Sequence, residues 1–232
     1  MDILSNGSSP AKVMRHIDKV LLATARLQLE SVANDRPRAI SFISGVGEEQ
    51  VDFEPAAAME GKVEMYLQVI LNAQRETLQK NLERSRKRYP LQPRIEWLLD
   101  ISPSGHSSDP AQIALLVAGI QSVLGIEEAM DSIEHGETNA LQSYAAQQQQ
   151  GLVDLVQWTQ TNLKVGERQR VMCLITMDAH TRDVLDKLHR EEAFHKNAFQ
   201  WQSQLKQRFV EREDAGLVVA RTEVHVCDAR AP

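Results

Sequence analysis

The sequence predicts a mostly α-helical protein: an antiparallel helical bundle with a small β-hairpin and a C-terminal strand. Apolar residues recur at intervals of three and four along several long stretches, which is the period of an amphipathic helix. Aromatic residues make up only 5% of the 232 residues, and there are 8 prolines and 11 glycines, a composition that suits helices better than an all-β fold. The length allows one large domain or two small ones and is sufficient to bury a core.

The first element expected is a helix from about residue 10 to residue 32, with Ser9 as its cap and Pro10 at its first position. Residues 39–44 and 50–53 then alternate between apolar and polar, which predicts a β-hairpin. Gly45 and Gly47 between them also allow a phosphate-binding turn. A dinucleotide fingerprint needs a third glycine, and the two glutamates that follow would repel phosphate, so a plain turn is the preferred interpretation.

A long helix is expected from about residue 57 to residue 89, where Pro90 and Pro93 stop it. Its end is basic, which complements the helix dipole and has two interpretations, a solvated helix end or a contact with an acidic partner. A short helix containing Trp97 should follow at 94–101, and then a flexible loop at 102–109.

Two further helices are expected at about 109–135 and 137–163, the first started by Asp109 and Pro110 and ended by Gly136. Because both are long and the connection is short, they should pack as antiparallel neighbours. Residues 217–227 alternate strictly, which predicts a strand.

The stretch from Gly166 to Phe209 has the strongest helical pattern in the chain. Asp178 and Thr181 lie on its apolar stripe, and a polar break at 195–197 divides it into two helices that should pack on each other. The second helix is expected to carry four apolar residues, Phe199, Trp201, Leu205 and Phe209.

Charge and cysteine content exclude several classes of function. The net charge of −6 argues against nucleic acid as a general partner. Cys173 and Cys227 are far apart, so neither a disulfide framework nor a zinc site is indicated, and Cys173 is expected to be buried on an apolar helix face. The N-terminus lacks the pattern of a signal peptide, and no stretch approaches 18 uninterrupted apolar residues, so no membrane span is expected.

Polar residues of the long stretch are the candidate site. Asp178, His180, Arg182 and Asp183 could form ion pairs on the helix surface, make a docking contact, or bind a metal. Metal binding is the weakest interpretation, because His180 and His189 are nine residues apart and zinc-binding helices place two histidines four apart. Ser203 has no neighbouring histidine to activate it. Trp201 is expected in the core or packed against a following domain.

Two motifs in this stretch resemble the end of the linker in dynein heavy chains. The first has a D-x-H-x-R-D core, and the second has an F-x-W-x-S-Q-L core at the expected separation; here they are Asp178, His180, Arg182 and Asp183, then Phe199, Trp201, Ser203, Gln204 and Leu205. The resemblance implies three segments: an N-terminal helix and hairpin at 1–56, a long-helix bundle at 57–215, and a strand at 216–232 that leads toward an AAA+ ATPase module. The second core and the Cys-Asp-Ala near the end look closer to axonemal outer-arm chains than to the cytoplasmic form.

The resemblance implies a mechanical, non-catalytic role, that of a lever that lies across the AAA+ ring of the same heavy chain and converts nucleotide-driven changes there into a power stroke. ATP and magnesium would belong to the parent motor, because the sequence has no glycine-rich turn ending in Lys-Ser or Lys-Thr. Expected partners are the ring, other dynein subunits and, through the parent motor only, microtubules, with no nucleic acid or membrane. The expected location is the cytoskeleton, with the ciliary axoneme favoured over the cytoplasm. The alternatives are a stand-alone helical scaffold or adaptor and, third, an unrelated enzyme.

Overall fold

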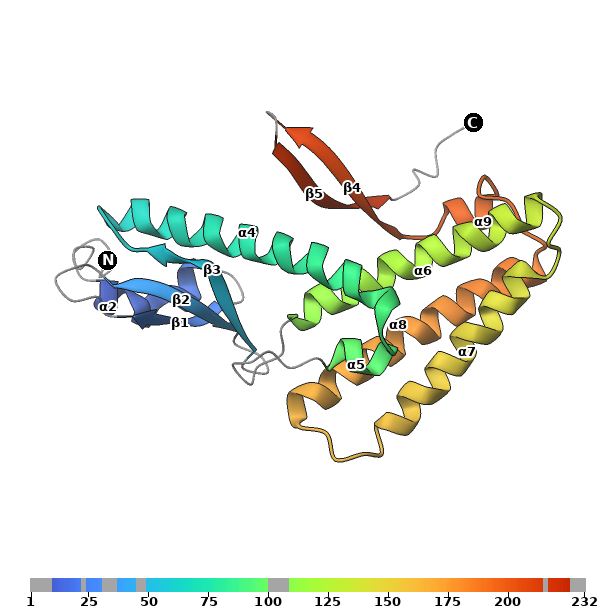
Figure 1. The fold of residues 1–232 in the computed structure, drawn as a ribbon, viewed down its shortest axis with the longest axis horizontal. Helices are drawn as coiled ribbons and strands as arrows, with labels where there is room; N and C mark the ends of the chain where they lie inside the picture. The colour runs from blue at the N-terminus through green and yellow to red at the C-terminus, as the bar shows by residue number, and fades with distance from the viewer. Residues whose placement is uncertain are drawn as a thin grey trace. The chain divides into compact units, whose positions relative to one another are not determined.

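The computed structural model describes residues 10–21, 24–30, 37–44, 49–99, 109–214 and 217–225, and their fold is mostly α, as predicted (Figure 1). The chain forms two compact units. The first contains Met1–Ser85 and Leu99–Ile113, and the second contains Arg86–Leu98 and Ala114–Pro232. The division predicted at residues 56 and 215 follows the family pattern and stays a prediction.

The first unit contains a three-stranded antiparallel sheet in the order β1-β2-β3. Its strands are β1 (Thr24–Glu30), β2 (Arg38–Ser44) and β3 (Gln50–Ala58), and they follow a short helical stretch of α2 (Pro10–Val13), η1 (Met14–His16) and α3 (Ile17–Val20). The predicted hairpin is confirmed, since Phe42 of β2 pairs with Val51 of β3. The glycines of its turn lie outside the described residues.

The prediction of a helix to residue 32 is wrong, because Thr24–Glu30 forms a strand. Leu27 and Leu29 are two residues apart, which is the period of a strand, but they lie in a run too short to separate from a helix by pattern. Pairing with β2 decides the conformation: Leu27 lies opposite Phe42 and is buried in the core of the unit.

Helix α4 (Val63–Arg88) covers this sheet with one face. It begins six residues later than predicted, because Ala57 and Ala58 still belong to β3. The buried apolar cluster joins α4 to the strands and to the N-terminal helical stretch; it consists of Val13, Ile17, Leu21, Leu27, Ala39, Phe53, Ala57, Met59, Val63, Tyr66 and Ile70.

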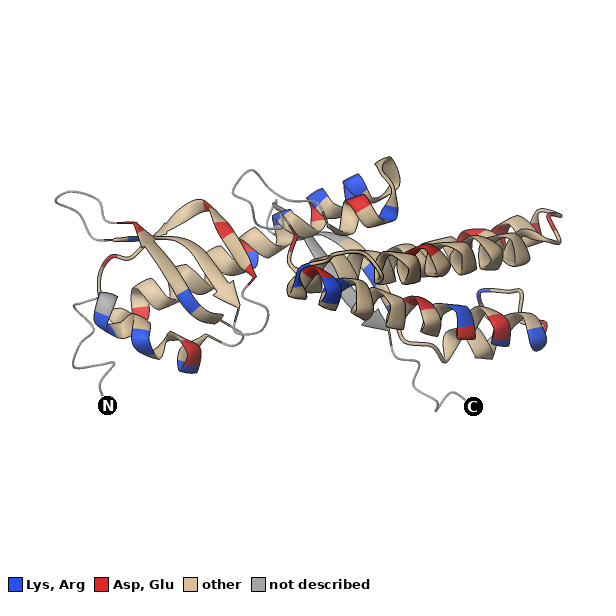
Figure 2. Ribbon diagram, turned by 90° about the horizontal axis from the view of Figure 1, so that it is seen from below, with Lys and Arg blue, Asp and Glu red and all other residues tan. Residues whose placement is uncertain are grey.

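The second unit is built on three long helices: α6 (Ala111–Glu134, whose first turn belongs to the first unit), α7 (Ala140–Trp158) and α8 (Val165–Arg190). The last turn of α4, η2 (Tyr89–Leu91) and α5 (Arg94–Leu98) complete it on one side. Gly136, with φ of 104°, permits the turn between α6 and α7, as the sequence predicts. Figure 1 shows α7 and α8 side by side, and Figure 2 colours the acidic and basic residues, which are interspersed along α4 and α8, whereas α6 and α7 carry acidic residues but no Lys or Arg.

A glycine sets how closely α7 approaches α6. A Cβ at Gly125 of α6 would lie 2.5 Å from the ring of Tyr144 on α7, so only glycine fits there. The Tyr144 hydroxyl donates to the Ser122 carbonyl at 3.4 Å. Burial raises the pKa of Tyr144, which keeps this hydroxyl protonated as a donor.

Helix α6 has the composition of a core helix. Judged by length and composition alone, it is the one helix among the described residues that is long and apolar enough to cross a membrane, although polar residues interrupt its apolar ones. In the structure 56% of its most apolar 18-residue stretch is buried. The apolar cluster of the second unit includes Val123, Ile126, Ala129 and Met130 of this helix. We therefore interpret α6 as the central packing element of that unit.

The C-terminal part differs from its prediction in one respect. Helix α9 (Phe199–Gln202) is a single turn, and β4 (Lys206–Asp214) follows it, so Phe209 lies on a strand. The predicted C-terminal strand is confirmed as β5 (Leu217–His225), which pairs antiparallel with β4.

Cys173 is exposed on α8, so its predicted burial is wrong. Residues 102–108 of the predicted loop lie outside the described residues.

Candidate functional site

The first motif, on α8, is divided between the interior and the surface. Asp178 is buried, and its carboxylate accepts two hydrogen bonds from the Arg94 guanidinium on α5, at 2.5 and 2.6 Å. The expectation that Asp178 forms an ion pair on the helix surface is therefore wrong. Arg182 instead pairs with Asp183 at 2.7 Å on the exposed side of α8. The sequence could not reveal Arg94 as the partner, because it lies 84 residues away.

Burial governs the electrostatics of the pair between α5 and α8. It raises the pKa of the Asp178 carboxyl, and the hydrogen bonds and charge of Arg94 oppose that shift. The planar guanidinium binds both carboxylate oxygens and so fixes the rotation of α5 relative to α8. Next to it, the Tyr89 ring packs edge-on against Trp97 with 4.9 Å between centroids. These contacts hold α5 and α8 in one relative position.

The second motif packs against α6 through Trp201. Its side chain is 2% exposed, which confirms the predicted core position. The indole Nε1 donates to Glu127 Oε1 at 3.1 Å, and the Lys206 ammonium lies 5.2 Å from the ring centroid. Arg208 of β4 pairs with the same Glu127 oxygen. Glu127 therefore connects α6 to both α9 and β4.

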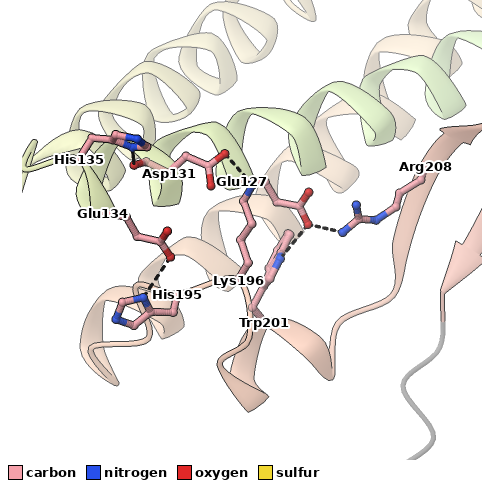
Figure 3. A network of polar contacts seen from close by, with 8 residues as sticks. All are labelled: Glu127, Asp131, Glu134, His135, His195, Lys196, Trp201 and Arg208. Carbon is pink, nitrogen blue, oxygen red and sulfur yellow. Dashed lines mark hydrogen bonds and ion pairs between the residues drawn. The ribbon is translucent and has the colours of Figure 1, made fainter.

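Glu127 belongs to a row of three acidic residues that sequence reasoning missed. Asp131 Oδ2 accepts a hydrogen bond from Lys196 Nζ at 2.6 Å, and Glu134 Oε1 lies 3.2 Å from His195 Nδ1 (Figure 3). We call these three residues, Glu127, Asp131 and Glu134, the carboxylate stripe. Their spacing of four and three residues places them on one face of α6, and that spacing is the signal that could have revealed them.

Four of the predicted site residues surround one pocket. His180 of α8 and Trp201, Gln204 and Leu205 of the second motif line a cavity of about 330 Å³ between α6, α8 and α9. Its remaining wall is largely apolar and includes Val123, Ile126, Met177 and Val184. The structure does not bring Asp178, Arg182, Asp183 or Phe199 to this pocket.

Three side chains in and near the pocket show which groups a binding partner could reach. The amide of Gln207 lies against Gly119, where any Cβ would overlap with it, and its Oε1 is buried without a hydrogen-bond partner among the described residues. Leu205, which lines the pocket, is 64% exposed, and Phe199, the first residue of α9, is 70% exposed. The predicted docking role of the second motif therefore concerns these two apolar side chains, since Trp201 is inside.

The described residues contain no group of three His, Cys, Asp or Glu side chains that could hold a metal ion. Instead, the contacts of both motifs join helix to helix: α5 to α8 through Arg94, and α6 to α9 and β4 through Glu127. These contacts therefore attach neighbouring helices, and one strand, to each other.

Comparison with known proteins gives the chain its relatives. The family model described as dynein heavy chain, N-terminal region 2, matches residues 1–85. The chain is 34% identical over 235 residues to the dynein alpha chain of the flagellar outer arm of Chlamydomonas reinhardtii, a match that covers 100% of this chain and 5% of that protein. It is 29% identical over 232 residues to the ciliary dynein beta chain of Tripneustes gratilla, and 29% over 231 residues to human dynein axonemal heavy chain 17. Each of these two matches covers 99% of this chain and 5% of the relative.

The class defined by these findings is a helical segment of a cytoskeletal motor chain. The chain belongs to the dynein heavy chain family and corresponds to part of its N-terminal region, with axonemal chains among its relatives. It spans 5% of the length of the curated relatives that it matches.

Proposed function

We propose that this chain is a non-catalytic lever segment, the C-terminal part of a dynein linker, which transmits nucleotide-driven changes of an AAA+ ring into a power stroke. The observation that carries the proposal is the match to axonemal heavy chains over 99–100% of this chain. Both linker motifs lie within that match.

The packing of the second unit supports a lever. Helices α6, α7 and α8 have 24, 19 and 26 residues, and one apolar cluster joins them. Close-packed interiors have low compressibility and transmit strain. The bidentate pair of Arg94 and Asp178 resists sliding of α5 along α8, because a slide of one turn would leave a buried charge unpaired. A segment of this kind passes on a displacement better than it absorbs one.

The proposed role assigns the chemistry to other parts of the heavy chain. ATP and magnesium would bind in AAA+ modules with a phosphate loop, and this segment would hold neither. Its direct partners would be the ring of the same chain and other dynein subunits, and it would reach microtubules only through the motor. The named relatives belong to flagellar outer arms, cilia and axonemes, so we propose an axonemal location. Nucleic acid and membranes are not among the proposed partners.

The test uses the complete heavy chain that contains this segment, with Asp178→Ala as the variant and Asp183→Ala as its control. Loss of Asp178 leaves Arg94 unpaired and loosens α5 from α8, whereas Asp183 is on the surface. Microtubule gliding velocity and ATP turnover are measured on the same preparation. A lever segment predicts slower gliding with ATP turnover kept in Asp178→Ala, and normal values for both in Asp183→Ala.

Two outcomes would contradict the proposal. Equal loss of gliding and ATP turnover would indicate that the segment belongs to the catalytic machinery. Unchanged gliding, with the loosened contact verified by hydrogen exchange at α5, would favour a passive scaffold.

A further inference from the structure

Residues 195–208, here called the strap, run back along α6 in reversed order. His195 contacts Glu134, Lys196 contacts Asp131, and Trp201 and Arg208 contact Glu127, so that residues later in the strap meet earlier positions of α6 (Figure 3). Every member of the carboxylate stripe therefore has a partner in the strap. The strap includes α9 and the start of β4.

Little apolar burial holds the strap in place. Trp201 is its deeply buried large apolar side chain, whereas Phe199 and Leu205 are 70% and 64% exposed. Its one helical turn is too short to be stable without tertiary contacts. The attachment of the strap consequently depends on one large apolar side chain and on charged contacts, whereas α8 contributes three buried apolar side chains, Val184, Leu185 and Leu188, to the apolar cluster.

The charged contacts are unequal in strength. The Glu127 side chain is 9% exposed, while those of Asp131 and Glu134 are each 46% exposed. Exposed ion pairs contribute little and are screened by salt, whereas a hydrogen-bonded buried carboxylate is costly to leave unmatched. Glu127 should therefore dominate the attachment, and the two outer pairs should add a smaller, salt-dependent part.

From these contacts we infer that the strap is a releasable lid: it detaches from α6 as a unit while α6, α7 and α8 stay folded, and the charge of the carboxylate stripe controls its release. Trp201, Gln204, Leu205 and Gln207 form the strap side of the cavity of about 330 Å³. Release would open that cavity into an apolar groove between α6 and α8, lined by Val123, Ile126, Met177 and Val184. It would also free the start of β4. This device goes beyond the proposed lever role and does not require it.

The strap carries its own reporters of release. The amides of Trp201, Gln202, Ser203 and Gln204 all donate to carbonyls within residues 198–201. They exchange with solvent when this turn unfolds, and a single turn is too short to stay folded once the strap has left α6. Hydrogen exchange measured by mass spectrometry on the complete 232-residue chain, near pH 7 and at low salt, separates these amides from those of α6, α7 and α8.

The main variant is Glu127→Gln, with Glu128→Gln as the matched control, because Glu128 is the next residue of α6 and is exposed. Losing the charge that Trp201 and Arg208 share should speed exchange of the strap amides at least about tenfold. Exchange in α6, α7 and α8 should stay unchanged, and the control should behave as the original chain does.

Two further variants keep the inference testable if Glu127→Gln fails to fold. Trp201→Phe retains a buried ring and loses the indole donor, so it should also speed strap exchange. Asp131→Asn with Glu134→Gln should speed it by about two- to threefold and reduce its dependence on sodium chloride. Equal acceleration in α6 and α8 would show that the unit unfolds as a whole and would overturn the inference. Unchanged strap exchange in both Glu127→Gln and Trp201→Phe would also overturn it.

Discussion

The sheet and α4 of the first unit bury polar side chains of a different kind from those of the second unit. On β1–β3 and α4, the buried polar side chains that the structure describes are uncharged, and two are joined by a hydrogen bond of 2.9 Å from Gln74 Nε2 to Thr24 Oγ1. The second unit instead buries the charged side chains of Glu127, Arg170, Asp178 and Lys206, and pairs the two carboxylates with Arg208 and Arg94. The sheet and α4 are held by apolar area with neutral polar contacts, and the second unit adds charged contacts between specific helices and a strand.

This difference indicates which kind of substitution should destabilise each unit most. Apolar packing is lost in proportion to the volume removed, and it responds little to charge or screening. A buried ion pair adds little net stability compared with an apolar pair of equal size, but breaking it from one side is expensive. We therefore expect the first unit to respond to volume changes and the second unit to unpaired charges.

The largest effect expected within the first unit is that of Ile70→Ala. Ile70 is fully buried in the cluster between α4 and the sheet, so the truncation should lower the free energy of unfolding of this unit by about 4 kcal/mol. Hydrogen exchange of the α4 amides measures the loss, which should be the same at low and high salt. Val69→Ala is the control, because its side chain is 43% exposed on the same helix, and its cost should be about 0.5 kcal/mol. Similar costs for both variants would refute the assignment of this core.

The next effect is that of Asp178→Ala in the second unit, at about 3 kcal/mol, because Arg94 is left without its partner. The double variant Asp178→Leu with Arg94→Met sharpens the comparison, since it removes both charges and keeps the volume. It should be more stable than Asp178→Ala when both are measured by urea denaturation. If the double variant were the less stable of the two, the pair would contribute net stability, and the proposed contrast between the units would fail.

The long helices could be predicted from the sequence because their signals are local. Apolar periodicity, Pro90 and Pro93 after α4, and Gly136 after α6 predicted α4, α6, α7 and α8 with errors of only a few residues at most ends. The strands β2, β3 and β5 were also predictable, since each alternates clearly.

The failures share a physical cause, which is that distant partners decided the outcome. Thr24–Glu30 became a strand by pairing with β2, and Lys206–Asp214 became one by pairing with β5. No glycine or proline marks the residue at which either strand begins. Arg94 is also 84 residues from Asp178 in the sequence, and Trp201 is 74 residues from Glu127, so neither pair can be recognised from local sequence. For the site, sequence motifs identified the correct stretch and the buried Trp201, whereas the partners that hold these residues required the structure.

The smallest effect concerns pH and tests the charged character of the second unit most directly. Burial raises the pKa of Asp178 above its ordinary value of 3.8, so the folded chain binds this proton more tightly than the unfolded chain does. The resulting stability is fully present below that ordinary value and is lost as the pH rises through the folded value. Asp178→Asn has no such proton.

The unfolding free energy of the original chain minus that of Asp178→Asn should therefore fall as the pH rises above 3.8, the ordinary pKa of this carboxyl. Urea denaturation at a series of pH values measures this difference, and subtraction removes the titration of other groups. A difference that rises with pH would mean that Arg94 lowers the pKa by more than burial raises it. The pair would then act as a stabilising salt bridge, and the contrast with the neutral polar contacts of the sheet and α4 would be one of strength as well as of kind.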